Sequence, residues 1–236
     1  MPLYLLPNLL GPIEDHKFFL PNSVDQIVPS LDGLIAESEK GGRRYLSRFK
    51  MHKKPSEIPI ALLNEHTRIS DIDFLLEPLV AGENWGVVAD AGLPCLADPG
   101  ASLVLRSHER NIAVKCFSGP SSITHSLMLS GLSGQRFNFY GYIARHPQER
   151  KKSLQLWERT KGVTHLFIEV PYRNVMTVKS CLETLQGATL FCIASQLTLP
   201  DEWVATKPIS MWKKENFDTL HPHLAKKNAI FLLTNV

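Results

Sequence analysis

The stretch VVADAGLPCLADPG, residues 87–100, decides the fold prediction. It begins with an apolar run and continues into a segment that holds two Asp, two Gly and two Pro residues. Such a pattern predicts a buried strand followed by a long loop. Open α/β sheets bind ligands in loops at the carboxyl ends of parallel strands. Glycine lets a ligand approach the backbone closely, and proline fixes the loop in advance. An ordinary strand–helix connection would be shorter, so we predict a binding loop.

Short apolar runs and amphipathic stretches alternate on both sides of this loop. The runs predict strands at Leu3–Leu6, Leu34–Ala36, Pro59–Leu63, Gly86–Ala89 and Ala113–Phe117. Apolar spacing between them favours helices at Ser23–Leu31, Gly42–Phe49, Ser70–Leu79 and Ala101–Glu109. This alternation indicates a parallel sheet covered by helices.

The alternation restarts after Gly131–Gln135, a stretch whose Gly and Ser content suits a linker or hinge. Further strands are expected at Phe137–Tyr140, Val163–Ile168, Thr189–Ala194, Trp203–Lys207 and Ala229–Thr234. Less helix separates the last of these, so this second sheet is expected to be mixed. The chain is therefore predicted to form two α/β domains, residues 1–118 and 119–236, joined near 118–135.

Composition sets further bounds on the class of protein. The 236 residues are 44% hydrophobic, enough for one large core or two small ones, and the net charge of +3 permits a nucleic-acid partner without requiring one. No apolar run can span a bilayer, and the start of the chain does not resemble a signal peptide. The four cysteines lack metal or redox spacing, which favours a cytoplasmic protein. His221-Pro222-His223 lacks partners at ligand spacing, so we expect a surface turn and no metal site.

A second loop, Ser118–Ser122, also follows a strand and opens a helix. Free N–H groups at a helix start, together with Ser hydroxyls, suit a carboxylate or another anion. Plain N-capping by Ser121 fits equally well.

With this second loop added, the chain resembles the tetrapyrrole methylase superfamily, which uses S-adenosylmethionine. Within it, the chain is most similar to the branch of 16S rRNA small subunit methyltransferase I. That branch carries S-D-A-G-T-P-x-x-S-D-P-G and P-G-P-S-A, which Ala89–Gly100 and Ser118–Ser122 match in order. Weaker matches follow at Ser130–Leu132, Phe137–Tyr142, Phe167–Arg173 and Ala194–Thr198. The similarity covers essentially the whole chain.

Three loops depart from the branch pattern: Pro7–Asp15, Ala36–Lys40 and Asn64–Thr67. The resemblance places these loops towards the substrate. Cofactor chemistry therefore carries over better than substrate identity.

The resemblance implies a tetrapyrrole methylase-like fold with S-adenosyl-L-methionine in the cleft between two α/β domains. The positions that match the family's cofactor residues come from both predicted domains. They are Pro7, Asp90, Ala91, Gly92, Pro94, Leu96, Ser121, Ser122, Tyr142, Glu169, Ala194, Leu197, Ala229 and Ile230.

The reaction that the resemblance implies is transfer of the methyl group to a ribose 2′-oxygen of 16S rRNA. A ribose hydroxyl is a poor nucleophile, so a general base would help. Glu65 and His66, which follow a predicted strand, are the first candidates, and Glu37 is the third. Each could instead have a surface or capping role.

Possible partners follow from charge and from the resemblance. Basic residues gather between Lys40 and Lys54 and again between Arg145 and Lys152, where they could contact RNA phosphates or form solvated faces. The resemblance implies 16S rRNA or the small ribosomal subunit as substrate, a homodimer, and no membrane. A small-molecule, tetrapyrrole-type methyltransferase remains an alternative. The altered loops also leave open a non-catalytic cofactor- or RNA-binding protein.

Overall fold

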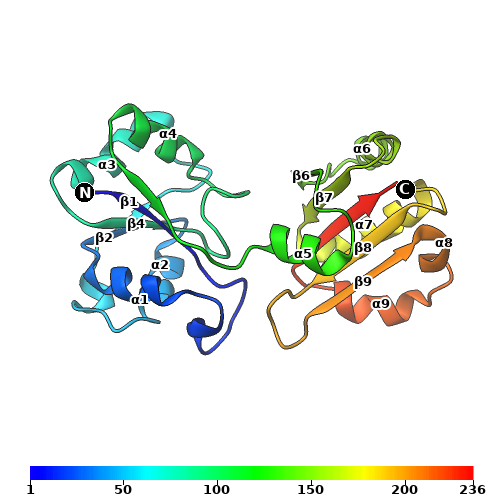
Figure 1. Cartoon of the computed structure of the whole chain (residues 1–236), viewed down its shortest axis with the longest axis horizontal. Coiled ribbons are helices and arrows are strands. Elements are labelled where there is room, and N and C mark those ends of the chain that lie inside the picture. The colour runs from blue at the N-terminus through cyan, green and yellow to red at the C-terminus, as the bar shows by residue number, and fades with distance from the viewer. Residues whose placement is uncertain (236) are drawn as a thin grey trace. The chain divides into compact units, whose positions relative to one another are not determined.

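A computed structural model describes residues 1–235 of the chain, which divides into two compact units, Met1–Ser121 and Ser122–Val236 (Figure 1). Each unit contains a five-stranded sheet with helices packed against it. The predicted two-domain α/β fold is thereby confirmed.

The sheet of the first unit is parallel throughout, as expected. It contains β1 (Leu3–Leu6), β2 (Gly33–Ala36), β3 (Ile60–Leu62), β4 (Trp85–Val88) and β5 (Val114–Cys116), in the order β3-β2-β4-β1-β5. Every pair of neighbours runs in the same direction. The loops that follow all five strands therefore leave from one edge, which we call the carboxyl edge of the first sheet.

Helices cover both faces of this sheet. One core includes residues of α1 (Asn22–Ile27) and α2 (Glu39–Leu46), and the other includes residues of α3 (Ile72–Val80) and α4 (Ala101–Glu109). Two helix bounds differ from the expected ones for local reasons. Helix α2 begins earlier, because Ser38 Oγ accepts a hydrogen bond from Gly41 N and caps it. Helix α1 ends earlier and gives way to a 3₁₀ turn that contains Pro29.

The sheet of the second unit is mixed, as predicted. It contains β6 (Phe137–Tyr142), β7 (Thr164–Glu169), β8 (Leu190–Ser195), β9 (Trp203–Pro208) and β10 (Ala229–Thr234), in the order β6-β7-β10-β8-β9. Strands β6 and β7 are parallel, whereas β10 runs antiparallel to both β7 and β8. The ends of β7 and β8 therefore lie beside the start of β10.

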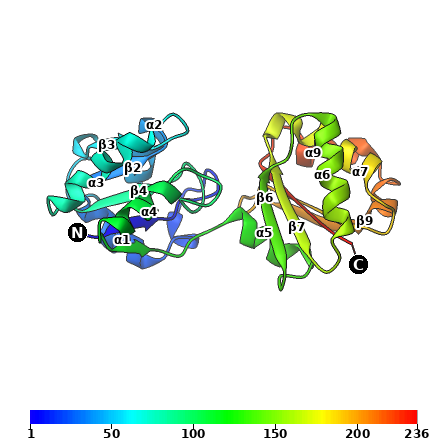
Figure 2. The same ribbon diagram turned by 90° about the horizontal axis from the view of Figure 1, so that it is seen from above.

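The helices of the second unit are α5 (Ser122–Ser130), α6 (Pro147–Arg159), α7 (Asn174–Thr184), α8 (Ile209–Trp212) and α9 (Phe217–Leu224) (Figure 2). Helix α5 packs on β8, β9 and β10, and α6 packs on α7. Gly131–Gln135, suggested as a linker or hinge, lies inside this unit between α5 and β6. The sheet holds this stretch by hydrogen bonds from Thr206 Oγ1 to Ser130 O (2.7 Å), directly before it, and from Thr164 Oγ1 to Ser133 O (2.7 Å), in its middle. His221-Pro222-His223 lies in α9 and does not form the expected turn.

Within residues 1–235, no helix is both long and apolar enough to cross a lipid bilayer. No group of His, Cys, Asp and Glu side chains in the same range is arranged to hold a metal ion.

Candidate functional site

The carboxyl edge of the first sheet joins three loops that are far apart in sequence. Asn8, just after β1, donates from Nδ2 to the carbonyl oxygens of Ala89 (2.8 Å) and Asp90 (3.0 Å). Glu37, directly after β2, accepts a hydrogen bond from Asp90 N at 2.9 Å. The loops after β1, β2 and β4 are therefore locked to one another through the start of the 90–100 segment.

This segment has a tightly curled backbone. Gly92 has a φ of +74°, and its carbonyl accepts from Asn8 N at 2.7 Å. Gly100 has a φ of +137°, and a Cβ there would lie 2.6 Å from Cys95 Sγ. Cys95 and Ala97 also adopt positive φ values, 68° and 67°. Such conformations cost energy for residues other than glycine, and strained backbone of this kind is concentrated at functional sites.

The predicted cofactor residues of this segment differ in exposure. Asp90, Ala91 and Leu96 are exposed, whereas Gly92 and Pro94 are buried. The exposed residues can meet a ligand directly, and the buried pair can shape the loop from below. A Cβ on Gly92 would lie 3.6 Å from Pro120 O, so this loop is also close to the segment that leads to Ser121 and Ser122. Pro7 packs at Gly119 of the same segment.

Helix α2 comes unusually close to the 90–100 loop. A Cβ on Gly41 would lie 2.1 Å from Asp90 Oδ1 and 2.8 Å from Ser38 Oγ. Ser38 Oγ itself donates to Asp90 Oδ1 at 3.3 Å. A side chain at position 41 would force the Asp90 carboxylate to move away from the first turn of this helix.

The predicted residues of the second unit gather at one edge of its sheet. In the strand register, Ala229 pairs with both Glu169 and Ser195, and Ile230 pairs with Ala194. Tyr142, at the end of β6, is exposed and pairs with Ile168 of β7. Leu197 is buried in the loop after β8. The ends of β6, β7 and β8 thus lie at the same edge of the sheet as the start of β10.

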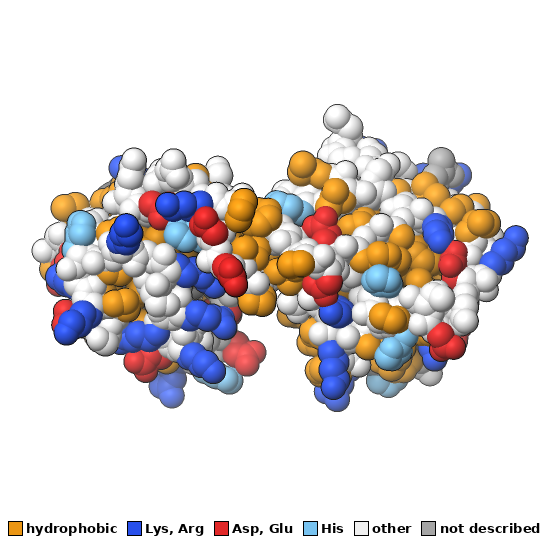
Figure 3. Space-filling model, turned by 90° about the horizontal axis from the view of Figure 1, so that it is seen from below, with side chains coloured by type: hydrophobic (Ala, Val, Ile, Leu, Met, Phe, Trp, Pro, Cys, Tyr) orange, Lys and Arg blue, Asp and Glu red, His pale blue; other side chains and the backbone are white. Residues whose placement is uncertain are grey.

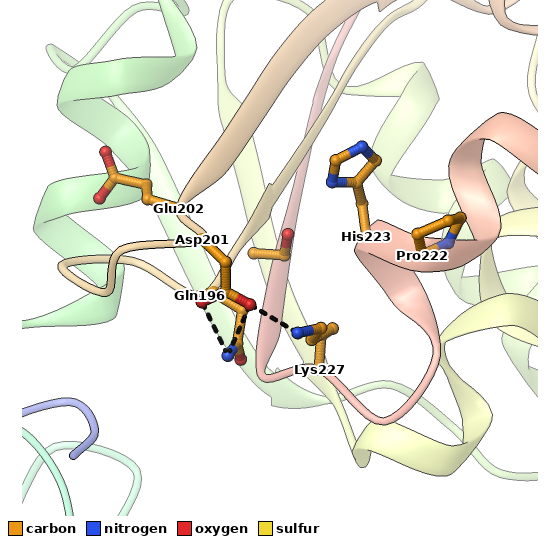
Figure 4. A pocket seen from close by; sticks show the side chains of 7 residues that line it. Gln196, Asp201, Glu202, Pro222, His223 and Lys227 are labelled. Atoms are coloured by element: carbon orange, nitrogen blue, oxygen red, sulfur yellow. Dashed lines mark hydrogen bonds and ion pairs between the residues drawn. The ribbon is translucent and has the colours of Figure 1, made fainter.

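A cavity of about 320 Å³ opens beside this edge of the second sheet (Figure 4). Asp201 accepts from Lys227 Nζ at 2.5 Å and from Gln196 Nε2 at 3.4 Å, and His223 of α9 lies across the cavity from this group. The His223 ring stacks on Trp203 with their centroids 4.3 Å apart. The complete lining is Ser195, Gln196, Asp201, Glu202, Pro222, His223 and Lys227.

Comparison with known proteins identifies relatives by sequence, although no protein-family model matches the chain. Ribosomal RNA small subunit methyltransferase I of Bacillus subtilis (strain 168) is 30% identical over 196 residues, which are 83% of this chain and 63% of that protein. The protein of the same name from Thermotoga maritima is 29% identical over 83% of both chains. The chain thus spans less than two thirds of the length of the first of these relatives.

Solved structures show the same fold at low sequence identity. The methyltransferase CobJ matches with a TM-score of 0.65 and 13% identity, over 100% of this chain and 94% of its own. Uroporphyrin-III C-methyltransferase from Thermus thermophilus, in a complex with S-adenyl homocysteine, matches with a TM-score of 0.57 and 14% identity, over 99% and 97%. The chain therefore shares the fold of these methyltransferases.

Among the three predicted base residues, only Glu37 is hydrogen-bonded to the 90–100 loop. Glu65 and His66 have side chains that are 86% and 85% exposed, and they approach each other to 3.6 Å. The His66 backbone N–H donates to Asn64 Oδ1 at 3.0 Å. These contacts keep the pair within its own loop after β3.

Glu169 has a buried carboxylate whose hydrogen-bond partners all lie within the second unit. It accepts from Arg173 Nη2 (2.6 Å), Val170 N (2.8 Å) and Thr177 Oγ1 (3.3 Å). The carboxylate therefore fixes the start of α7 on the end of β7. This role explains the Glu and Arg of the Phe167–Arg173 motif in structural terms.

Asp98 was not among the predicted residues of the site. Its carboxyl group is half-buried, and no hydrogen bond or ion pair of it is found within residues 1–235. Burial, followed by the charges of Glu37 and Asp90, raises the pKa of Asp98 to about 7. Asn8, Ser38 and Gly41 were missed as well. Two adjacent glycines in an amphipathic helix were the available signal for a close approach at Gly41.

Proposed function

We propose that the chain is an S-adenosylmethionine-dependent methyltransferase that methylates a ribose 2′-oxygen of 16S rRNA in the small ribosomal subunit. The single observation that carries this proposal is the 90–100 loop. It matches the signature of the branch, and it is curled at Gly92 and tied to the loops after β1 and β2. The names of the sequence relatives support rRNA as the substrate.

The residues of the loop fit the proposed cofactor in shape and charge. Asp90, Ala91 and Leu96 are exposed on a bent backbone, which suits contacts between main-chain groups and a nucleoside. Glu37, Asp90 and Asp98 make this edge negative, and a sulfonium cation would relieve their mutual repulsion. When bound, S-adenosylmethionine supplies an activated methyl group. We keep the fourteen predicted cofactor residues as the proposed binding site of S-adenosylmethionine.

Orientation is the main contribution that we propose for the protein. Holding the nucleophile in line with the methyl group and excluding water can lower the barrier by about 7–11 kcal/mol. Of the three candidate bases, we favour Glu37 as the acceptor of the ribose hydroxyl proton. Its Oε1 is fixed by the Asp90 N–H, so its other oxygen keeps a defined direction.

Two measurements test this function in sequence. Calorimetry should detect S-adenosylmethionine binding to the full chain, and labelled methyl should then pass from it to small ribosomal subunits that lack the modification. Binding without transfer to any RNA would refute rRNA methylation and favour a non-catalytic binder. Transfer to a tetrapyrrole alone would assign the chain to small-molecule chemistry.

We also propose that the protein is a cytoplasmic homodimer, which rests on the family resemblance. Sedimentation at micromolar concentration should give twice the chain mass. A single species of monomer mass would refute the dimer.

A further inference from the structure

Positive charge is concentrated in one short segment of the first unit. Residues 39–54 hold seven of the 26 Lys and Arg residues and one of the 23 Asp and Glu residues. The formal charge of this segment is therefore +6, against +3 for the whole chain, and the remaining residues carry −3. Without this segment the chain would carry a net negative charge.

The fold presents much of this charge to solvent. Helix α2 buries Gly41, Gly42, Tyr45 and Leu46, so that Lys40 and Arg44 share its exposed face at a spacing of four residues. The chain that follows the helix exposes further lysines. We use the term cationic surface for Lys40, Arg44, Lys50 and Lys54, which are all exposed.

Arg43 holds the two parts of this surface together. Its Nη1 donates to the carbonyl oxygens of Pro55 and Ile58, both at 2.5 Å, which fixes the segment after α2 against the helix. Lys54 directly precedes Pro55, so its position beside the helix is set by the same contact.

The charges of the cationic surface are not neutralised within residues 1–235. Other basic side chains nearby have partners, since Lys53 pairs with Asp32 at 3.1 Å. None of the four surface cations forms an ion pair in the described part of the chain. Burial and the neighbouring Arg44 charge lower the pKa of Arg48, which is consistent with unscreened like charges in this region.

The surface is also fixed to the candidate site. The first turn of α2 touches the Asp90 side chain at Gly41, directly beside Lys40. Arg48, after the end of the helix, donates from Nη1 to Asn8 Oδ1 at 2.7 Å. A helix of this length spans about 12 Å. A chain bound along it would therefore stay next to the carboxyl edge.

We propose that the cationic surface binds the phosphate backbone of the RNA substrate on one side of the nucleotide to be methylated. This inference rests on the proposed function. The face of the first unit in Figure 3 shows Lys and Arg side chains spread across it, with Asp and Glu among them. The aromatic residues of the segment, Tyr45 and Phe49, are buried and cannot stack on bases. The contact is thus made to phosphates, so it positions the RNA without reading its sequence.

The test compares two double variants by fluorescence anisotropy on a short labelled single-stranded RNA over a range of salt concentrations. Arg44→Ala with Lys54→Ala removes two cations of the surface. Lys213→Ala with Lys214→Ala removes two exposed lysines that follow α8 as the matched control. We expect the first pair to weaken binding about tenfold and to reduce the salt slope by about 1.4, at roughly 0.7 per phosphate contact. The loss should be equal for RNAs of different sequence, and the control should change neither quantity.

Folding and cofactor affinity provide the internal checks. Both variants should keep the wild-type melting temperature and S-adenosylmethionine affinity, since the side chains removed are exposed and form no ion pair within residues 1–235. If the two double variants weaken binding equally, or if the first has no effect, the cationic surface does not bind the RNA. RNA binding that depends on the surface without methyl transfer would refute the proposed function alone. A wild-type chain that binds no RNA would refute both.

Discussion

Carboxylates at the edges of the two sheets are held in opposite ways. In the first unit, burial and the charges of Glu37 and Asp90 raise the pKa of Asp98 to about 7. In the second unit, buried Glu169 is satisfied by Arg173, by a backbone N–H and by Thr177. One edge stores electrostatic repulsion that a bound cation could relieve. At the other edge, the hydrogen-bonded carboxylate of Glu169 holds a strand end and a helix start together. A carboxylate thus stabilises the second unit, whereas one in the first unit destabilises it.

The largest effect is expected from loss of Glu169. Glu169→Ala leaves the mostly buried Arg173 guanidinium without its counter-charge, and breaking a buried pair in this way costs about 3–5 kcal/mol. Urea unfolding followed by circular dichroism would measure the loss. Glu183→Ala, at an exposed position of α7, is the control and should change stability by less than about 0.5 kcal/mol. Equal losses for the two variants would mean that the contacts of Glu169 do not stabilise the second unit.

The next effect concerns activity at the first edge. Glu37→Gln keeps an oxygen that can accept from Asp90 N but removes the charge, so methyl transfer should fall by about 10²-fold or more if Glu37 is the base. Glu65→Gln should stay within about twofold, because this side chain is exposed and away from the contacts of the loop. Single-turnover rates with saturating S-adenosylmethionine measure both. A larger loss for Glu65→Gln than for Glu37→Gln would identify Glu65, in the loop after β3, as the general base.

Glu37→Gln has a second readout that a purely structural role would not produce. The Glu37 charge is the largest cause of the Asp98 pKa shift after burial. Its removal should lower the pKa of Asp98 and move any pH dependence that Asp98 imposes towards lower pH. Carbon-detected NMR titration of the Asp98 carboxyl group would follow this shift directly.

Much of the fold could be predicted from the sequence, because it depends on local patterns. Runs such as Leu3–Leu6 and Ala229–Thr234 are apolar and short, and the structure has strands at the same residues. The special role of Asp98 could not be predicted. It depends on Glu37, which follows a strand adjacent to β4 in the sheet but distant in sequence, and strand order cannot be read from periodicity. The choice between a base and a surface role for Glu65 and His66 could not be made for the same reason, since their exposure depends on the position of β3 at the sheet edge.

The smallest effect, and the one of opposite sign, is expected from Asp98→Asn. The folded-state pKa of Asp98 lies above its ordinary value of 3.8, at about 7. Between these values the folded chain keeps a proton that the unfolded chain releases, so stability falls as pH rises through this window. Near pH 4 the variant and wild type should be equally stable. By pH 8 the variant should be more stable by about 1–2 kcal/mol, a fraction of the full shift because the group is partly exposed to water. Urea unfolding at both pH values measures the difference. A variant that is less stable at pH 8 would show that the Asp98 carboxylate, like that of Glu169, has a stabilising partner, and the contrast between the two edges would disappear.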